Sequence, residues 1–285
     1  KIKNRMDKDI EGVIRVLRGA GVILFGTLVG RFLGLIGQIL LARTLLPQNF
    51  GDITLAYTIV AMLSVIVVLG TAKGVPRLIS GDESIDYKQK ILLSAFLITL
   101  PAGLVFLIGI RYVSKYAGPI FKNPELGILL PIFGIYLLLS PVKKILIGGL
   151  QGMEYSWEVV TARNIIGRIL GITVFLLFSY FGAALIGSIA YYLMMETSIV
   201  VLAGYFVYVR MFKGAWYGGF PKWTHLKEIF SFSWPLAISG SFVMLMGNFD
   251  MLMIGYFLQS ANVGYYKAVQ PLASLVLIVL SSFVF

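Results

Sequence analysis

Eight long stretches of mostly apolar residues, joined by short connectors, make up most of this 285-residue sequence. A helix that crosses about 30 Å of hydrocarbon needs roughly 20 such residues. With 58% hydrophobic and only 13% charged residues, the chain carries more apolar surface than a water-soluble fold of this size can bury. We therefore expect an all-α, polytopic transmembrane bundle of about eight helices, at approximately 19–42, 51–72, 91–112, 126–147, 159–181, 183–209, 230–257 and 263–285.

Charge and residue usage exclude several classes of protein. The net charge is +11, but the 24 Lys and Arg residues are dispersed between apolar blocks and form no continuous basic stripe, so we expect no nucleic-acid partner. The chain has no cysteine and a single histidine, His225. We therefore expect no disulfide, no metal site and no cofactor.

The basic residues predict the orientation in the membrane. Seventeen Lys and Arg residues fall on the side of the N-terminal segment 1–18, and five on the other side. The larger group includes Lys143, Lys144 and Arg163. We interpret the pair Lys143 and Lys144 as an anchor at the membrane surface, the alternative being capture of an anionic headgroup. Since cytoplasmic connectors are enriched in Lys and Arg, we expect a multi-pass protein of a prokaryotic cytoplasmic membrane with its N-terminus inside the cell.

Two connectors resemble each other across the chain. Within residues 40–52 and 254–268, an offset of 213 aligns 41–52 with 254–265 without a gap, which pairs Leu45 with Leu258, Asn49 with Asn262 and Gly51 with Gly264. Each connector joins a leading span to the next span. This spacing predicts a parallel six-helix repeat related by an axis along the membrane normal.

The repeat suggests a division of the chain. We expect a basic cytoplasmic segment at 1–18, a six-helix lobe at 19–209, a cytoplasmic interfacial linker at 210–229 and the start of a second lobe at 230–285. The sequence lacks an initiator Met and ends within an apolar run, so we expect it to be truncated at both ends.

Four motifs resemble those of the polysaccharide flippases of the MATE-like multidrug/oligosaccharidyl-lipid/polysaccharide exporter superfamily. They are the two connectors above, residues 148–154 (GGLQGME) and residues 230–236 (FSFSWPL). The resemblance implies 12 to 14 helices in two lobes around a central cavity, and movement of lipid-linked oligosaccharides to the outer leaflet. It also implies a monomer whose partners are membrane lipids, the lipid-linked glycan and glycan-assembly enzymes. This chain departs from the pattern in holding one lobe plus two helices.

Charged side chains inside the spans are candidates for the substrate site, because a charge at mid-bilayer costs about 2.5–3.5 kcal/mol on insertion scales. Arg31 and Gln38 lie seven residues apart on nearly the same face of the first span. Asn164 and Arg168 share a face of the fifth. The resemblance implies a pyrophosphate as their ligand, whereas the alternatives are an ion pair of Arg31 with Glu196 or Asp250 and an Arg168 that reaches the headgroups.

Acidic and amide side chains in later spans are candidates for a coupling-ion site or a cavity wall. Glu196 continues a polar stripe with Ser188 and Tyr192, while Asn248 and Asp250 interrupt the seventh span. Proton or sodium coupling is one interpretation, and a structural salt bridge is the other.

Two further functions remain open. A cation-coupled multidrug exporter of the same superfamily would use Glu196 and Asp250 beside an apolar cavity, although two intramembrane arginines disfavour cationic drugs. An integral membrane glycosyltransferase or acyltransferase would need an Asp or His cluster on a sizeable polar loop, and no connector is long enough. We therefore expect a transporter and not an enzyme.

Overall fold

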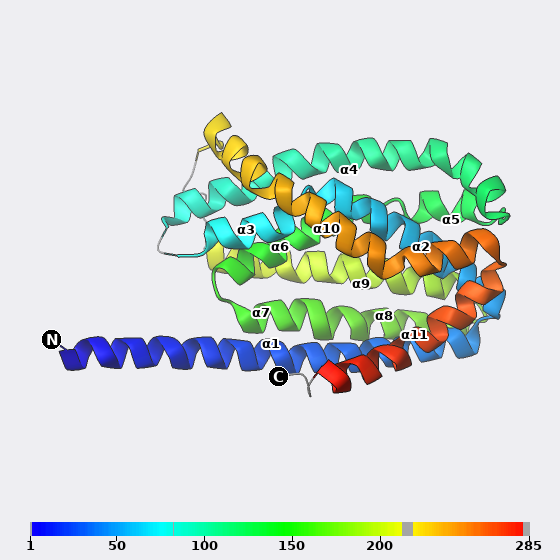
Figure 1. The fold of residues 1–285 in the computed structure, drawn as a ribbon, viewed down its shortest axis with the longest axis horizontal. Coiled ribbons are helices and arrows are strands. Elements are labelled where there is room, and N and C mark those ends of the chain that lie inside the picture. The colour runs from blue at the N-terminus through cyan, green and yellow to red at the C-terminus, as the bar shows by residue number, and fades with distance from the viewer. Residues whose placement is uncertain (1, 82, 213–218, 282–285) are drawn as a thin grey trace.

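The computed structural model describes residues 2–81, 83–212 and 219–281, which form helices joined by turns. The helices run roughly side by side, and the N-terminal helix projects from one end of the bundle (Figure 1). Seven helical segments of this described part are long and apolar enough to cross a membrane. An additional helix, α11 (Ser260–Ser281), occupies the eighth predicted span; residues 282–285 of that span lie outside the described residues. The prediction of an all-α transmembrane bundle is confirmed.

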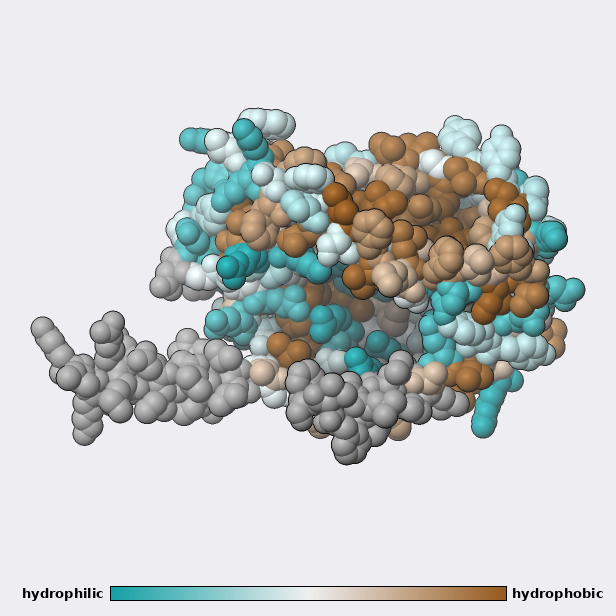
Figure 2. All heavy atoms as spheres, in the orientation of Figure 1, coloured by the Kyte–Doolittle hydropathy of each residue, from teal (hydrophilic) through white to brown (hydrophobic). Residues whose placement is uncertain are grey.

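The surface has the distribution of polarity that a bilayer requires. In the upper part of the face in Figure 2, hydrophobic residues cover the middle and hydrophilic residues gather toward the two ends; further hydrophilic residues lie in the lower middle. We call the end with the connectors after residues 79, 152 and 212 the basic end, and the end with the turns at 45–46, 122–125, 181–183 and 258–259 the opposite end.

The first two long helices meet at the opposite end. Helix α1 (Ile2–Thr44) is followed by α2 (Pro47–Val68), whose proline at the first turn needs no hydrogen-bond donor. The second predicted span, 51–72, continued past this helix, but Leu69 and Gly70 adopt left-handed backbone angles (φ 49° and 73°). The chain therefore turns into a short helix, α3 (Thr71–Ile79).

The next two spans are longer or more interrupted than their apolar runs indicated. Helix α4 (Ile85–Phe121) starts where the Ser84 hydroxyl accepts a hydrogen bond from the Tyr87 amide (3.3 Å). Its 37 residues extend about 55 Å, which exceeds the hydrocarbon thickness. The fourth span consists of α5 (Leu126–Phe133) and α6 (Tyr136–Gly152).

The fifth and sixth spans contain wide helical turns. The fifth consists of α7 (Ser156–Val160), the π-helical segment η1 (Thr161–Ile166) and α8 (Gly167–Tyr180). The sixth is α9 (Ala184–Val207), which continues into a second π segment, η2 (Tyr208–Phe212). Helices α8 and α9 pack along each other, and α6 packs against α9.

The seventh helix begins within the predicted linker. Helix α10 (Trp223–Phe257) starts seven residues before its predicted span, so the last third of the linker 210–229 is helical. The middle of that linker, residues 213–218, lies outside the described residues. Helix α10 packs against α2, α3 and α4, and the backbone of Ser233 lies where a side chain on Gly70 would be (2.0 Å).

Two apolar clusters form the interior, one toward each end of the bundle. The cluster nearer the opposite end includes Leu137 of α6 and Tyr192 of α9. The cluster nearer the basic end includes Ile145 of α6 and Ile199 of α9. Residues that lie between these positions on α6 and α9 are therefore at the middle depth of the bundle.

The first turns of α2 and α11 pack against each other in a reciprocal way at the opposite end. A Cβ added to Gly51 would lie 1.8 Å from the Ser260 carbonyl oxygen, and one added to Gly264 would lie 2.3 Å from that of Pro47. Ser260 and Pro47, like the two glycines, are 213 residues apart. The Asn123 amide donates to Asp52 and to Ser260 (both 2.7 Å) and closes the junction.

Candidate functional site

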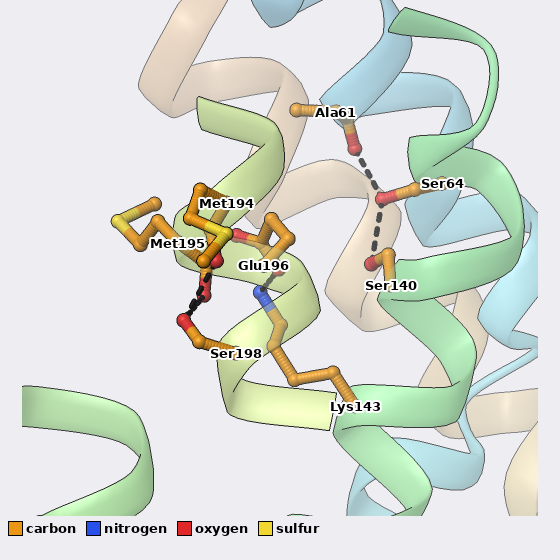
Figure 3. A network of polar contacts seen from close by, with 8 residues as sticks. All are labelled: Ala61, Ser64, Ser140, Lys143, Met194, Met195, Glu196 and Ser198. Carbon is orange, nitrogen blue, oxygen red and sulfur yellow. Dashed lines mark hydrogen bonds and ion pairs between the residues drawn. The ribbon is translucent and has the colours of Figure 1, made fainter. Parts of the chain in front are cut away.

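A buried ion pair joins α6 to α9 in the middle of the bundle. The Lys143 ammonium donates to the Glu196 carboxylate, and the exposed fractions of the two side chains are 16% and 3%. Figure 3 shows Lys143 reaching across from α6 to Glu196, with the Ser64–Ser140 hydrogen bond (3.2 Å) nearby on α2 and α6. The ring of Tyr136 lies 5.5 Å from the ammonium. The pair thus holds two helices together at a depth that water does not reach freely.

The depth of this pair corrects one prediction. Lys143 and Lys144 were expected to be surface anchors, but α6 continues for nine residues beyond Lys143 to Gly152. Nine residues correspond to about 13 Å of helix, and both lysines are largely shielded. They lie between the two apolar clusters and within the span.

Three more basic residues accompany the pair. Lys144 is close enough to Lys143 for their charges to interact, as are Arg163 to Lys143 and Arg168 to Arg163. We call Lys143, Lys144, Arg163 and Arg168 the cation cluster. Glu196 is the carboxylate whose charge interacts with both lysines of this cluster. Positive charge therefore exceeds negative charge at mid-depth.

The wide turn η1 places two members of this site. A π turn changes the direction of the side chains that follow it and is frequent at functional sites. The Arg163 side chain donates to the Asn164 side-chain oxygen (3.1 Å). Two buried donors, Nδ2 of Asn164 and Nε of Arg168, have no hydrogen-bond partner among the described residues. Buried donors without partners are uncommon in proteins, so these two atoms keep the capacity to donate hydrogen bonds to an anion.

Helix α1 covers these donors closely because it carries glycines there. A Cβ on Gly30 would lie 2.9 Å from the Cβ of Asn164, and one on Gly34 would lie 2.0 Å from Nη1 of Arg168. The predicted residues Asn164 and Arg168 are thus neighbours. Asn164 is 7% exposed.

Arg31 and Gln38 lie on α1 itself. Arg31 is exposed and Gln38 is half-buried. None of the residues in the described ranges forms an ion pair or hydrogen bond with Arg31. The alternative in which Arg31 balances Glu196 or Asp250 is therefore wrong, because Glu196 pairs with Lys143 and Asp250 has other partners.

Asn248 and Asp250 make contacts within the last two helices. The Asn248 amide donates to the Met244 carbonyl (3.0 Å), which is a bond inside α10. The exposed Asp250 carboxylate accepts from the Tyr266 hydroxyl of α11 and from the Met251 amide (2.9 Å). These two residues and Glu196 therefore have separate sets of partners.

Three cations of this site, Lys143, Lys144 and Arg163, were missing from the predicted substrate residues. The available signal was the apolar run Ile145–Leu150, which follows the two lysines and continues the span toward its end. A span extended to Gly152 places both lysines inside the membrane. The pairing of Lys143 with Glu196, 53 residues away, has no local signal.

Comparisons with known proteins place the chain in a family. Among solved structures, it is similar to a MOP superfamily transporter from Pyrococcus furiosus with 16% sequence identity and a TM-score of 0.46. The match covers 90% of this chain and 62% of that one, so this chain spans less than two thirds of that transporter's length. A search of curated proteins found no match. The family model described as polysaccharide biosynthesis protein matches residues 16–285, and the chain therefore belongs to the polysaccharide biosynthesis protein family of membrane proteins.

Proposed function

We propose that this protein moves lipid-linked oligosaccharides across the cytoplasmic membrane, and that the cation cluster receives the phosphate groups of the lipid carrier. The observation that supports the proposal is the excess of positive charge at mid-depth, beside two buried donors without partners in the described chain. Membership in a polysaccharide biosynthesis family agrees with such a substrate.

Electrostatics favour an anionic ligand. Each uncompensated charge inside a bilayer costs several kcal/mol on most scales, and a bound pyrophosphate removes that cost for more than one cation. Arginine forms paired hydrogen bonds to phosphate oxygens, and lysine adds a point charge. We infer that Arg31, exposed on α1 near Gly30 and Gly34, extends the site, with Gln38 on the same helix.

The proposed arrangement of the chain follows the repeat. Residues 19–209 form one lobe, and 230–285 begin a second that is related to it by an axis along the membrane normal. The reciprocal contact of Gly51 and Gly264 supports this arrangement. We propose that transport proceeds by alternating access between the two lobes, without covalent chemistry. In this proposal the N-terminus is cytoplasmic, and glycan-assembly enzymes supply the substrate.

The multidrug exporter is less well supported. Its expected carboxylates are both bonded, Glu196 to Lys143 and Asp250 to Tyr266. Two lysines, Lys143 and Lys144, interact with Glu196, and Arg163 lies near Lys143, so the excess positive charge repels a cationic drug.

A vesicle assay tests the proposal. The protein is reconstituted in vesicles that contain a fluorescent polyprenyl-pyrophosphate oligosaccharide, and the fraction accessible to an external quencher is followed with time. We expect faster transfer between leaflets than in protein-free vesicles, and a loss of at least about tenfold when Arg163 and Arg168 are both changed to Gln. Transfer no faster than in protein-free vesicles, or transport of lipophilic cations instead, would contradict the proposal.

A further inference from the structure

One cation of the site, Lys143, is already bonded to a carboxylate of the protein, that of Glu196. Glu196 is 2% exposed and pairs with Lys143, while Asn164 and Arg168 keep donor atoms without partners in the described part of the chain. One cation of the site therefore binds an anion of the protein itself, whereas the two other donors bind none in the described part of the chain.

A carboxylate and a phosphate bind a lysine ammonium in the same way, through charge-assisted hydrogen bonds. A buried ammonium without any anion is strongly unfavourable. The empty site therefore needs an internal anion, and Glu196 supplies it. A phosphate that arrives beside Glu196 meets repulsion from a like charge within a medium of low dielectric constant, where such repulsion is strong.

We propose that Glu196 is an internal counter-anion that holds Lys143 while the site is empty and gives it up to the phosphate of the substrate. This inference rests on the proposed function for the identity of the ligand. Because the phosphate must displace a bonded carboxylate, Glu196 lowers the affinity of the site. A transporter benefits from such weakening, since its ligand must leave as well as enter.

A second ion pair offers a matched control. Arg210 donates to Glu158 (2.7 Å), and Glu158 is 7% exposed. This pair also joins two segments of the bundle, α7 and η2, but neither residue belongs to the cation cluster.

The test measures the binding of inorganic pyrophosphate to the purified protein by titration calorimetry at constant pH. Relative to the wild type, Glu196→Gln is expected to bind pyrophosphate about 10- to 100-fold more tightly, the range for gaining one charge-assisted hydrogen bond. Glu158→Gln is expected to leave the affinity unchanged. The gain is expected to disappear in the double variant Glu196→Gln, Lys143→Gln, because the freed ammonium is its source.

Equal or weaker binding by folded Glu196→Gln would overturn the inference, and so would absence of binding in both proteins. If Glu196→Gln does not fold, Glu196→Asp keeps the charge but withdraws the carboxylate from Lys143 by one methylene, and it should bind more tightly than the wild type by a smaller factor. No tightening in the Asp variant overturns the inference equally. A protein that binds pyrophosphate as described but does not transfer the lipid-linked oligosaccharide would contradict the proposed function alone.

Discussion

Two glycines of α1 determine how closely the first helix approaches the cation cluster. Gly30 lies against Asn164, and Gly34 lies against the guanidinium of Arg168, at distances that leave no room for a methyl group. Small residues allow helices in membranes to pack closely. Here the closeness has a second effect, because it fixes the position of a charged side chain.

Replacing Gly34 by Ala should therefore weaken the site without unfolding the protein. The new Cβ would lie 2.0 Å from Nη1 of Arg168, the flexible end of a long side chain, so Arg168 moves and the helices stay. We expect pyrophosphate affinity to fall by about tenfold, equivalent to part of one charge-assisted hydrogen bond. Gly21→Ala is the control, since nothing lies within 4 Å of its Cβ. Equal affinity in the two variants would contradict the prediction.

Arg31→Ala should reduce transfer of the lipid-linked oligosaccharide by about 10- to 100-fold, if Arg31 contributes one charge-assisted hydrogen bond. Its melting temperature should stay that of the wild type, because Arg31 is exposed. Arg31→Lys should restore transfer only in part, since a point charge lacks the planar fork of arginine. Full transfer by Arg31→Ala would remove Arg31 from the site.

At the scale of single helices, the lengths of the apolar runs predicted the spans but not the positions where the backbone interrupts the helices. The run 51–72 remains apolar across Leu69 and Gly70, although the backbone turns there, because hydropathy does not report a left-handed φ. The same limit hides the π turn at 161–166, which determines where Arg163 and Asn164 point. The site was predicted in part: Asn164 and Arg168 share a helical face, which spacing reveals, whereas Lys143 meets Glu196 only through the packing of α6 on α9.

The junction of α2 and α11 gives a prediction at this scale. Gly51→Ala would place a methyl group 1.8 Å from the backbone oxygen of Ser260, which cannot rotate away. Forcing the helices apart should cost about 1–3 kcal/mol of unfolding free energy, the usual range for overpacking. Thermal unfolding in detergent should show the lower melting temperature. Gly109→Ala on α4 has open space around it and should not show this loss.

For the whole molecule, the distribution of charge still predicts one orientation. Removing Lys143, Lys144 and Arg163 from the seventeen leaves fourteen Lys and Arg residues on the basic side against five. The bias is therefore strong enough to survive the correction.

Accessibility labelling checks this orientation. Because the chain has no native cysteine, an introduced cysteine is the only residue that a thiol reagent labels. Cysteines at Gly81 and Gly219, both exposed at the basic end, should react only from the cytoplasm. Cysteines at Gln48 and Lys122 should react only from outside. Asn123 is unsuitable because it is 4% exposed and bonded to Asp52. The reverse pattern would mean that the N-terminus is outside.

The glycine contact between α2 and α11 has a consequence for the origin of the molecule. Each side of it presents the same feature to the other: Gly51 meets Ser260, and Gly264 meets Pro47, the residue that corresponds to Ser260. Self-complementary contact of this kind defines the isologous interface of a two-fold homodimer. An interface of this geometry is what the proposed repeat would leave within one chain if two identical ancestral subunits had been joined into one gene.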